Sequence, residues 1–234
     1  MKVSVIIPVY NEKRTIRRLL DKVQAVKLAK EVIIVDDGSS DGSREILKEK
    51  LKNPKKFKLL LHPKNKGKGA AVRTGLKKAS GDVIIIQDAD LEYNPEDYHK
   101  LLKPIKEGKA EVVYGSRFLG RSLRIFGNNP TPMPLHWVGN KFLTWLTNLL
   151  FRNGITDMET CYKIFTRKVA RSLKLESNRF DFEPEITAKI LKKGYKILEI
   201  PIYQRPRSYK AGKKITWRDG IIALYTLLKY RFVD

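Results

Sequence analysis

Residues 82–90 read Asp-Val-Ile-Ile-Ile-Gln-Asp-Ala-Asp, a run of branched apolar side chains that ends in Asp88 and Asp90. An apolar run of this length is typical of a strand that is buried on both faces, as in parallel sheets. Ligands of open α/β sheets bind beyond the carboxyl ends of the strands. We therefore expect Asp88 and Asp90 at the edge of a sheet, where they either bind a divalent cation or belong to a solvated turn.

Similar apolar runs recur along the first half of the chain, and stretches with helical spacing separate them. The runs are residues 2–10, 31–37, 57–62 and 111–115. Asn11 is expected to cap the first of the intervening helices. Successive strand–helix units with short links predict right-handed crossovers and a mostly parallel sheet, so the fold class is α/β.

The second half of the chain differs in composition, and we place a change of role near residue 116 within one domain of residues 1–234. Residues 120–135 are rich in Arg, Asn, Gly and Pro and predict a mobile loop. Helices are expected over residues 137–151, 183–193 and 216–230, and strands over residues 160–166 and 195–203.

The chain is strongly basic, since 48 Lys and Arg against 25 Asp and Glu give a formal net charge of +23 over 234 residues. Such a balance favours anionic partners, which are nucleic acid, a membrane surface or phosphorylated small molecules. Abundant Lys and Glu are also typical of heat-adapted proteins, although here Lys far exceeds the acidic residues. No recognised nucleic-acid-binding motif occurs, so we expect no nucleic-acid partner.

Cysteine content and hydropathy limit the class further. Cys161 is the single cysteine, which excludes an intrachain disulfide and a cysteine-based zinc site. The chain shows no signal-peptide pattern, and no apolar run approaches the ~20 residues that span a bilayer. We expect a cytoplasmic protein that can still contact a membrane surface.

Two basic segments are candidates for phosphate contacts. Residues 64–69 (KNKGKG) resemble a phosphate cradle but do not match the GxxxxGK[ST] pattern, and the alternative is an exposed turn. Residues 205–214 are rich in Arg and Lys, and the alternative there is a solvated basic loop.

The helices expected over 137–151 and 216–230 combine Trp, Phe, Tyr and Leu with flanking Lys and Arg. This composition is typical of interfacial helices that lie on a membrane. The alternative is that both apolar stripes belong to the protein core.

Four short motifs occur in a characteristic order. They are Pro8-Val9-Tyr10-Asn11-Glu12, Asp36-Asp37-Gly38-Ser39, Asp88-Ala89-Asp90 and Gly115-Ser116-Arg117. In this order and spacing the chain resembles the family 2 glycosyltransferases, and among them the polyprenol-phosphate sugar synthases, the group of dolichol-phosphate mannose synthase. The resemblance continues through residues 157–163 (DMETCYK) and 199–201 (EIP). It implies a GT-A fold, which is Rossmann-like with a mostly parallel sheet, plus C-terminal amphipathic helices at the membrane interface.

For residues 1–116 the resemblance implies a pocket for a nucleotide sugar. Its base and nucleoside contacts would come from Pro8, Tyr10, Glu12, Val35 and Asp37. Asp88 and Asp90, with Ala89 between them, would hold Mg²⁺ or Mn²⁺ on the donor diphosphate. Glu92 would contact the donor where relatives commonly have Gln.

For residues 117–234 the resemblance implies an acceptor site beside membrane-facing helices. Arg117 would contact phosphate, as would Arg207 together with Lys213 or Lys214; for Arg117 the alternative is a surface salt bridge. The candidate catalytic residues are Asp90, Arg117, Asp157 and Glu185.

The reaction that the resemblance implies is inverting transfer of a hexose to dolichyl or polyprenyl phosphate, with mannose from GDP-mannose as the first expectation. UDP-glucose or UDP-N-acetylglucosamine as donor, or a saccharide hydroxyl as acceptor, are the alternatives. A lipid phosphate is already an anion, whereas a hydroxyl needs a general base, for which Asp157 and Glu185 are candidates.

Many relatives continue into membrane spans after the last helix. The sequence therefore leaves three expectations: peripheral binding at the cytoplasmic face of the membrane, a separate membrane-anchoring subunit, or a longer protein.

Overall fold

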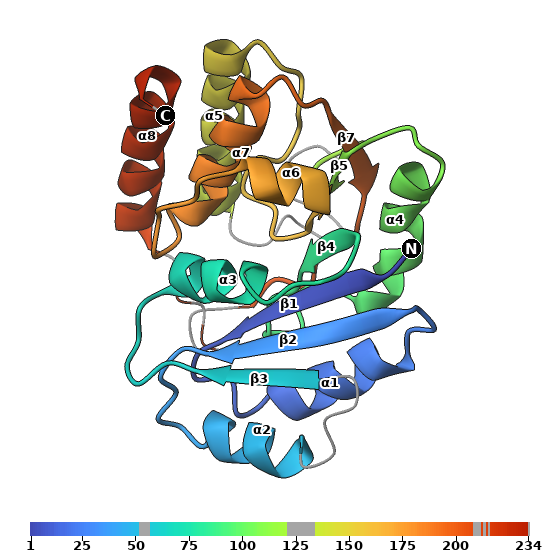
Figure 1. The fold of residues 1–234 in the computed structure, drawn as a ribbon. Coiled ribbons are helices and arrows are strands. Elements are labelled where there is room, and N and C mark those ends of the chain that lie inside the picture. Colours follow the sequence, from blue (N-terminus) through green and yellow to red (C-terminus); the bar gives the residue numbers. More distant parts are fainter. Residues whose placement is uncertain (52–56, 121–133, 208–211, 213, 215, 234) are drawn as a thin grey trace, which may run out of the picture.

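The computed structural model describes residues 1–51, 57–120, 134–207, 212, 214 and 216–233. They form a seven-stranded sheet in the order β3-β2-β1-β4-β6-β5-β7, with helices on both faces (Figure 1). The strands are β1 (Val3–Val9), β2 (Lys30–Asp36), β3 (Phe57–Leu61), β4 (Val83–Ile86), β5 (Val112–Ser116), β6 (Lys163–Thr166) and β7 (Ile197–Pro201).

The sheet is mostly parallel, which confirms the predicted fold class. Only β6 runs against its neighbours, since it is antiparallel to both β4 and β5 among the described strands. The other neighbouring strands pair in parallel. The antiparallel strand belongs to the second half of the chain, where the pattern of strand–helix units ends.

The helices follow the predicted pattern with two differences. They are α1 (Ile16–Ala25), α2 (Ser43–Lys50), α3 (Lys68–Leu76), the 3₁₀ helix η1 (Pro95–Asp97), α4 (Tyr98–Lys106), α5 (Pro134–Phe151), α6 (Arg167–Ser172), α7 (Phe182–Lys192) and α8 (Trp217–Phe232). The sequence did not predict α6, which is too short to show a period. Asn11 does not cap α1, because it has a φ of 51° and its Oδ1 accepts a hydrogen bond from the Ser40 N–H; Thr15 precedes the helix instead.

The central strands are buried on both faces, as the apolar run at residues 82–90 predicts. Every residue of β4 is at most 1% exposed. Ile7 and Ile85 belong to an apolar cluster with residues of α1 and α4. Ile6 and Ile84 belong to a second cluster with residues of α3 and α7 on the other face.

The carboxyl ends of β1, β2 and β4 meet at one edge of the sheet, because these strands are parallel neighbours. Ile6 of β1 pairs with Ile86 of β4, and Val9 of β1 pairs with Asp36 of β2. The segments that follow the three strands therefore leave the sheet side by side.

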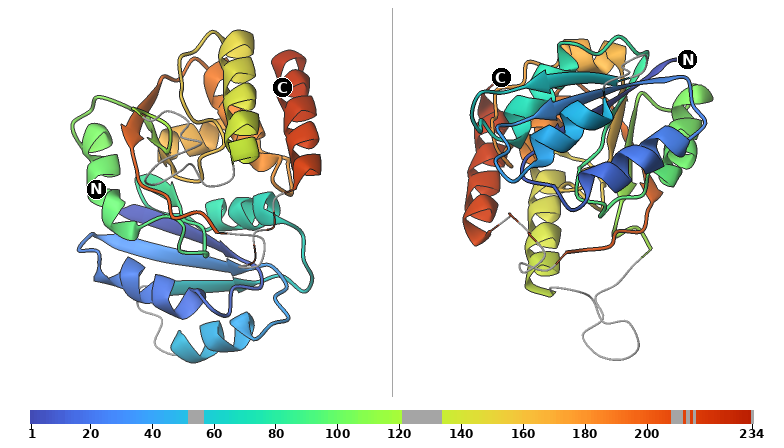
Figure 2. Two further views of the ribbon diagram at one scale, coloured as in Figure 1. Left: turned by 180° about the vertical axis from the view of Figure 1, so that it is seen from behind. Right: turned by 90° about the horizontal axis from the view of Figure 1, so that it is seen from below.

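Helices α5 and α8 stand next to each other beside α7, on one side of the sheet (Figures 1 and 2). Leu143 of α5 packs with Ala223 and Leu227 of α8 in a small apolar cluster of their own. Each helix thus buries one stripe, while other large apolar side chains stay exposed. Within the described ranges no helix is both long and apolar enough to cross a bilayer.

Candidate active site

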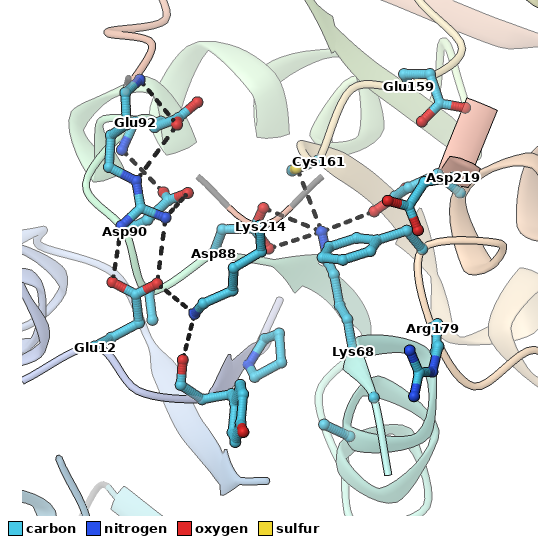
Figure 3. A pocket seen from close by; sticks show the side chains of 18 of the residues that line it. Glu12, Lys68, Asp88, Asp90, Glu92, Glu159, Cys161, Arg179, Lys214 and Asp219 are labelled. Carbon is cyan, nitrogen blue, oxygen red and sulfur yellow. Dashed lines mark hydrogen bonds and ion pairs between the residues drawn. The ribbon is translucent and has the colours of Figure 1, made fainter. Parts of the chain in front are cut away.

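A pocket of about 570 Å³ lies beyond the carboxyl ends of β1, β2 and β4. Its floor comes from the segments after these strands, and its far side comes from α5, the segment before β6, α7 and the first turn of α8. A volume of this size is typical of small-ligand sites, which occur at such sheet edges. Figure 3 shows many of the side chains that line it.

Three acidic side chains gather at one side of the pocket around a single guanidinium group. Arg207 lies 3.0 Å from Glu12 through Nη1, 3.1 Å from Asp90 through Nη2 and 3.5 Å from Glu92 through Nε. Lys214 adds an ion pair of 2.9 Å to Glu12 and donates to the Tyr10 carbonyl oxygen. The structure therefore brings together Arg207 and Lys214 with residues 10–12 and 90–92, which are far apart in the sequence.

The surroundings of Asp90 disfavour its ionised form and raise its pKa. Burial raises the pKa of Asp90 to about 7, and the charges of Asp88 and Glu92 act in the same direction. The positive charge of Arg207 opposes this rise but does not cancel it. The carboxyl group therefore stays protonated to a higher pH than an ordinary aspartate unless more positive charge is supplied.

Asp88 has its own cationic partner. Lys68 at the start of α3 lies 2.8 Å from Asp88 Oδ1 and 2.9 Å from Glu183 Oε1, and its Nζ is 3.3 Å from the sulfur of Cys161. Burial acts to raise the pKa of Asp88, but the charge of Lys68, the hydrogen bonds from Cys161 and Lys68 and the charge of Arg207 together lower it.

The start of α3 is fixed by a close approach of two backbone segments. A Cβ on Gly67 would lie 2.3 Å from the Asn178 carbonyl oxygen, and one on Gly69 would lie 2.4 Å from that of Ser177. Glycine at both positions lets α3 approach the segment before α7 closely, and this places Lys68 between Asp88 and Glu183.

The carboxylate groups of Asp88 and Asp90 are suitable ligands for a divalent cation. Carboxylate oxygens are the ligands that Mg²⁺ and Mn²⁺ prefer, and the burial that raises the pKa of Asp90, together with the charges of Asp88 and Glu92, disfavours its ionised form unless a cation is near. No set of three or more His, Cys, Asp or Glu in a metal-binding arrangement occurs in the part of the chain that the structure describes. Magnesium sites commonly consist of one or two carboxylates, with phosphate oxygens of the substrate as further ligands.

Asp37 anchors a loop. Its carboxylate accepts hydrogen bonds from the backbone N–H groups of Lys66 and Gly67, and it lies 2.7 Å from Nδ1 of His62. In the turn at residues 64–69, the N–H groups of Lys66 and Gly67 thus already donate to Asp37 and are not available to a phosphate. This does not support the phosphate-cradle interpretation. Asp37 still lines the pocket, as do the predicted residues Pro8, Tyr10, Glu12, Asp88, Ala89, Asp90 and Glu92. Val35 does not line it, because this side chain is buried in β2.

Arg117 and Asp157 form a buried ion pair at the other side of the pocket. The guanidinium group donates through Nε at 2.7 Å and Nη2 at 2.6 Å to the two oxygens of Asp157. Arg117 lines the pocket, whereas Asp157 is fully buried behind it. The pair is therefore not a surface salt bridge, and Asp157 positions Arg117 and is not placed to act as a base.

Glu185 does not reach the pocket, in contrast to its predicted place near the acceptor. Its two oxygens accept hydrogen bonds of 2.8 Å from the N–H groups of Glu176 and Ser177, and Lys189 forms an ion pair with it at 2.8 Å. The side chain is fully buried in α7 and holds the preceding segment.

Several pocket residues were missed by the sequence analysis because they come from the second half of the chain. They are Glu159, Cys161, Arg179, Phe180 and Glu183, together with His136 and Asn140 of α5. Burial raises the pKa of Glu159 to about 7, since the charges of Lys163 and Arg117 do not compensate for it. The DMETCYK stretch pointed to this region, but Asp157 was selected there in place of Glu159.

Two predictions fall outside the described residues. These are the assignment of Lys213 as a phosphate contact and most of the loop predicted over 120–135.

A family profile and similar proteins of known name all indicate the same protein family. The sequence profile described as Glycosyl transferase family 2 matches residues 4–173. UDP-N-acetylglucosamine–dolichyl-phosphate N-acetylglucosaminyltransferase of Methanococcus voltae is 30% identical, over 97% of this chain and 94% of that protein. The low-salt glycan biosynthesis hexosyltransferase Agl6 of Haloferax volcanii is 30% identical over 93% of this chain, which spans about half (51%) of that protein.

Among solved structures, the chain is similar to glucosyl-3-phosphoglycerate synthase from Mycobacterium tuberculosis. The complex of that enzyme with UDP gives a TM-score of 0.76 at 18% identity, covering 100% of this chain and 81% of that chain. The complex with Mn²⁺, UDP and phosphoglyceric acid gives 0.73 at 17% identity, covering 100% and 79%. The pocket at the sheet edge, the family profile over most of the chain and this shared fold lead to one conclusion: the chain belongs to glycosyl transferase family 2 and is a glycosyltransferase with the GT-A fold.

Proposed function

We propose that this protein is an inverting, metal-dependent glycosyltransferase that moves a hexose from a UDP-sugar to a polyprenyl phosphate such as dolichyl phosphate. One observation carries the proposal. The pocket that holds Asp88 and Asp90 is bordered by α5 and α8, whose outer faces expose large apolar side chains. A pocket for an anionic, water-soluble donor thus opens beside a surface suited to a lipid-borne acceptor.

The comparisons support a uridine nucleotide as donor. The Methanococcus voltae relative is named for UDP-N-acetylglucosamine and dolichyl phosphate, and the solved structures with a similar fold contain UDP. We therefore propose UDP-N-acetylglucosamine or UDP-glucose ahead of the GDP-mannose that the sequence analysis placed first.

Asp88 and Asp90 are the residues that would hold Mn²⁺ or Mg²⁺ on the donor diphosphate. Structures of the Mycobacterium tuberculosis enzyme with UDP contain either of these ions. A divalent cation there would stabilise the negative charge that develops on the leaving diphosphate.

The basic residues of the pocket bring two anionic substrates together. Arg207 and Lys214 supply positive charge at the nucleotide side, where Tyr10 and Glu12 also lie. Arg117, fixed by Asp157, presents a cation at the other side, where the acceptor phosphate would approach. A lipid phosphate is an anion at neutral pH, so this reaction requires no general base among these residues.

The apolar faces of α5 and α8 support binding at a membrane surface. Trp145 of α5 is 57% exposed, and Trp217, Tyr225 and Phe232 of α8 are 71%, 67% and 81% exposed. Basic residues accompany them, among them Arg218, which lies over the Trp217 ring. Aromatic side chains mixed with Lys and Arg are typical of interfacial helices, and anionic lipid attracts such a surface by about 1 kcal/mol per basic residue. A separate anchoring subunit stays a prediction.

An assay of transfer with two kinds of acceptor tests the proposal. The protein is incubated with Mn²⁺ and radiolabelled UDP-sugars, together with either a polyprenyl phosphate in detergent or a mixture of soluble glycans. We expect labelled sugar in the organic phase only with the lipid phosphate, and none with Asp90→Asn as the inactive control. Label that passes to soluble glycans and not to the lipid phosphate would overturn the proposed acceptor.

A further inference from the structure

We propose that Glu159 determines which sugar is transferred, by accepting a hydrogen bond from a hydroxyl group of the donor hexose. The inference rests on the proposed function, and it adds a residue that recognises the sugar portion of the donor.

The first observation is an unpaired oxygen that lines the pocket. Oε1 of Glu159 is buried and has no hydrogen-bond partner among the residues that the structure describes. A buried acceptor without a partner is unfavourable, and native proteins contain few of them. A ligand that donates a hydrogen bond would satisfy this oxygen.

The other acidic side chains of the pocket already have partners. Asp88 pairs with Lys68 and Asp90 with Arg207, and Glu183 forms ion pairs with Lys68 and Lys163 at 2.9 and 2.5 Å. Oε1 of Glu183 also has no hydrogen bond, but Lys68 lies 2.9 Å from it, whereas no ion pair of Glu159 occurs among the described residues.

The backbone around Glu159 is held on both sides. Lys163 is fully buried, and its Nζ donates to the carbonyl oxygens of Met158 at 2.9 Å and Thr160 at 2.5 Å. The Met158 N–H donates to Thr144 Oγ1 of α5 at 3.1 Å. The neighbouring residues are thus fixed while the Glu159 carboxylate is left for a ligand, which is how a pre-organised binding residue is supported.

The position of Glu159 identifies the part of the ligand that it meets. In Figure 3 Glu12 lies at one side of the pocket and Glu159 at the other, with Asp88 between them. Tyr10 and Glu12 belong to the proposed nucleotide side, and Asp88 and Asp90 to the diphosphate. In a nucleotide sugar the sugar follows the diphosphate, so the hexose would extend towards Glu159.

The chemistry fits a hexose, whose hydroxyl groups are hydrogen-bond donors for a carboxylate. A site built to bind a substrate hydroxyl discriminates strongly against an analogue that lacks it, because the protein group is then left unpaired. Glu159 would therefore separate sugars by the presence and orientation of one hydroxyl group.

Calorimetric titration of two ligands in the presence of Mn²⁺ tests the inference. The ligands are UDP and whichever of UDP-glucose and UDP-N-acetylglucosamine binds the wild-type protein more tightly. We expect Glu159→Gln and Glu159→Ala to weaken the UDP-sugar by about 10- to 100-fold, the effect of one hydrogen bond to a charged group, and to leave UDP within about twofold. Glu49→Gln, the same change at an exposed site on α2, serves as the matched control.

The UDP titration also shows whether each variant is folded. An equal loss of affinity for both ligands, or unchanged affinity for the UDP-sugar, would overturn the role of Glu159. A wild-type protein that binds neither ligand would instead refute the proposed donor, so the two failures are distinguishable.

A second measurement needs no substitution. Deoxy analogues of the preferred UDP-sugar, each lacking one hydroxyl, are titrated against the wild-type protein and against Glu159→Ala. We expect one analogue to bind about 10-fold or more weakly to the wild type, and to bind Glu159→Ala as well as the parent sugar does. If every analogue bound the wild type like the parent, the inference would be wrong.

Discussion

Burial raises the pKa of Asp90, and neighbouring charges act on it in both directions. Its pKa of about 7 lies above the usual value of 3.8, so the folded protein binds this proton more tightly than the unfolded chain does. The resulting contribution to stability is fully present below about pH 4 and is lost as the pH rises through about 7. Asp90 is thus retained at a cost in stability, as is common for binding residues.

We predict that Asp90→Asn lowers transfer by about 100-fold or more, because the pocket loses a carboxylate that would bind the cation. In metal-free buffer at pH 8 the same variant should melt at or above the temperature of the wild type, since a buried charge next to Asp88 and Glu92 is removed. Thermal denaturation with a chelator at pH 5 and pH 8 measures this. A variant that melts well below the wild type at pH 8 would contradict the explanation.

Asp157 carries a different prediction, since it holds Arg117 from a fully buried position. Asp157→Asn leaves a buried guanidinium without its charged partner, which should destabilise the protein by about 3–5 kcal/mol. Asp82→Asn removes a carboxylate that pairs with Arg167 at the surface and should have little effect. Chemical denaturation of the two variants compares them; equal small losses would show that the buried pair is unimportant.

The sequence predicted the acidic pair at residues 88 and 90, because it directly follows a buried strand. It did not predict that Lys68 forms an ion pair with Asp88 and Arg207 with Asp90, since both partners come from distant segments. Glu159 and Glu183 were missed for the same reason. Which side chains of the second half face the pocket depends on tertiary packing that leaves no periodic signal.

At the scale of elements, most strands and helices followed from apolar spacing, and the exceptions have local causes. Helix α6 spans only six residues, too few to show a helical period, and Thr166 caps it. The reversed direction of β6 also has no signature in its own residues, because direction is set by the path of the chain through α5.

The approach of α3 to the segment before α7 leads to a prediction at this scale. Gly69→Ala should destabilise the protein by about 1–3 kcal/mol and weaken UDP binding, since its Cβ would lie 2.4 Å from the Ser177 carbonyl oxygen and push Lys68 away. Gly139→Ala in α5 is the matched control, because a Cβ there meets open space. In an exposed helix interior this change should stabilise by about 0.5–1 kcal/mol. The order of the melting temperatures, with Gly69→Ala lowest, is the expected result.

At the scale of the whole molecule, helices α5 and α8 lie away from β3, one of the two edge strands of the sheet (Figure 1). Under the proposed function, the exposed apolar side chains of α5 and α8 would face the lipid on this side of the molecule. The sequence left open whether the two stripes belong to the core or to an interface, and each helix in fact has both a buried and an exposed stripe.

We predict that replacing Trp217 and Tyr225 together by Ser lowers binding to vesicles with anionic lipid by about 10-fold or more, because both side chains are largely exposed on α8. Leu61→Ser, at an exposed apolar site on β3, is the control and should bind like the wild type. Sedimentation with vesicles measures the effect, and binding should also weaken as salt is added. Equal binding of all three proteins would exclude α8 from the membrane contact.

The pairing of Asp88 with Lys68 and of Asp90 with Arg207 has a consequence for the order in which ligands load. With these internal counter-ions in place, a lone manganese ion would compete with the ammonium group of Lys68 and the guanidinium group of Arg207, and a lone diphosphate would meet carboxylates. If cation and diphosphate bound together, the displaced Lys68 and Arg207 would have phosphate oxygens to pair with. Cation and nucleotide should therefore bind with positive heterotropic cooperativity, each raising the affinity for the other by the same factor.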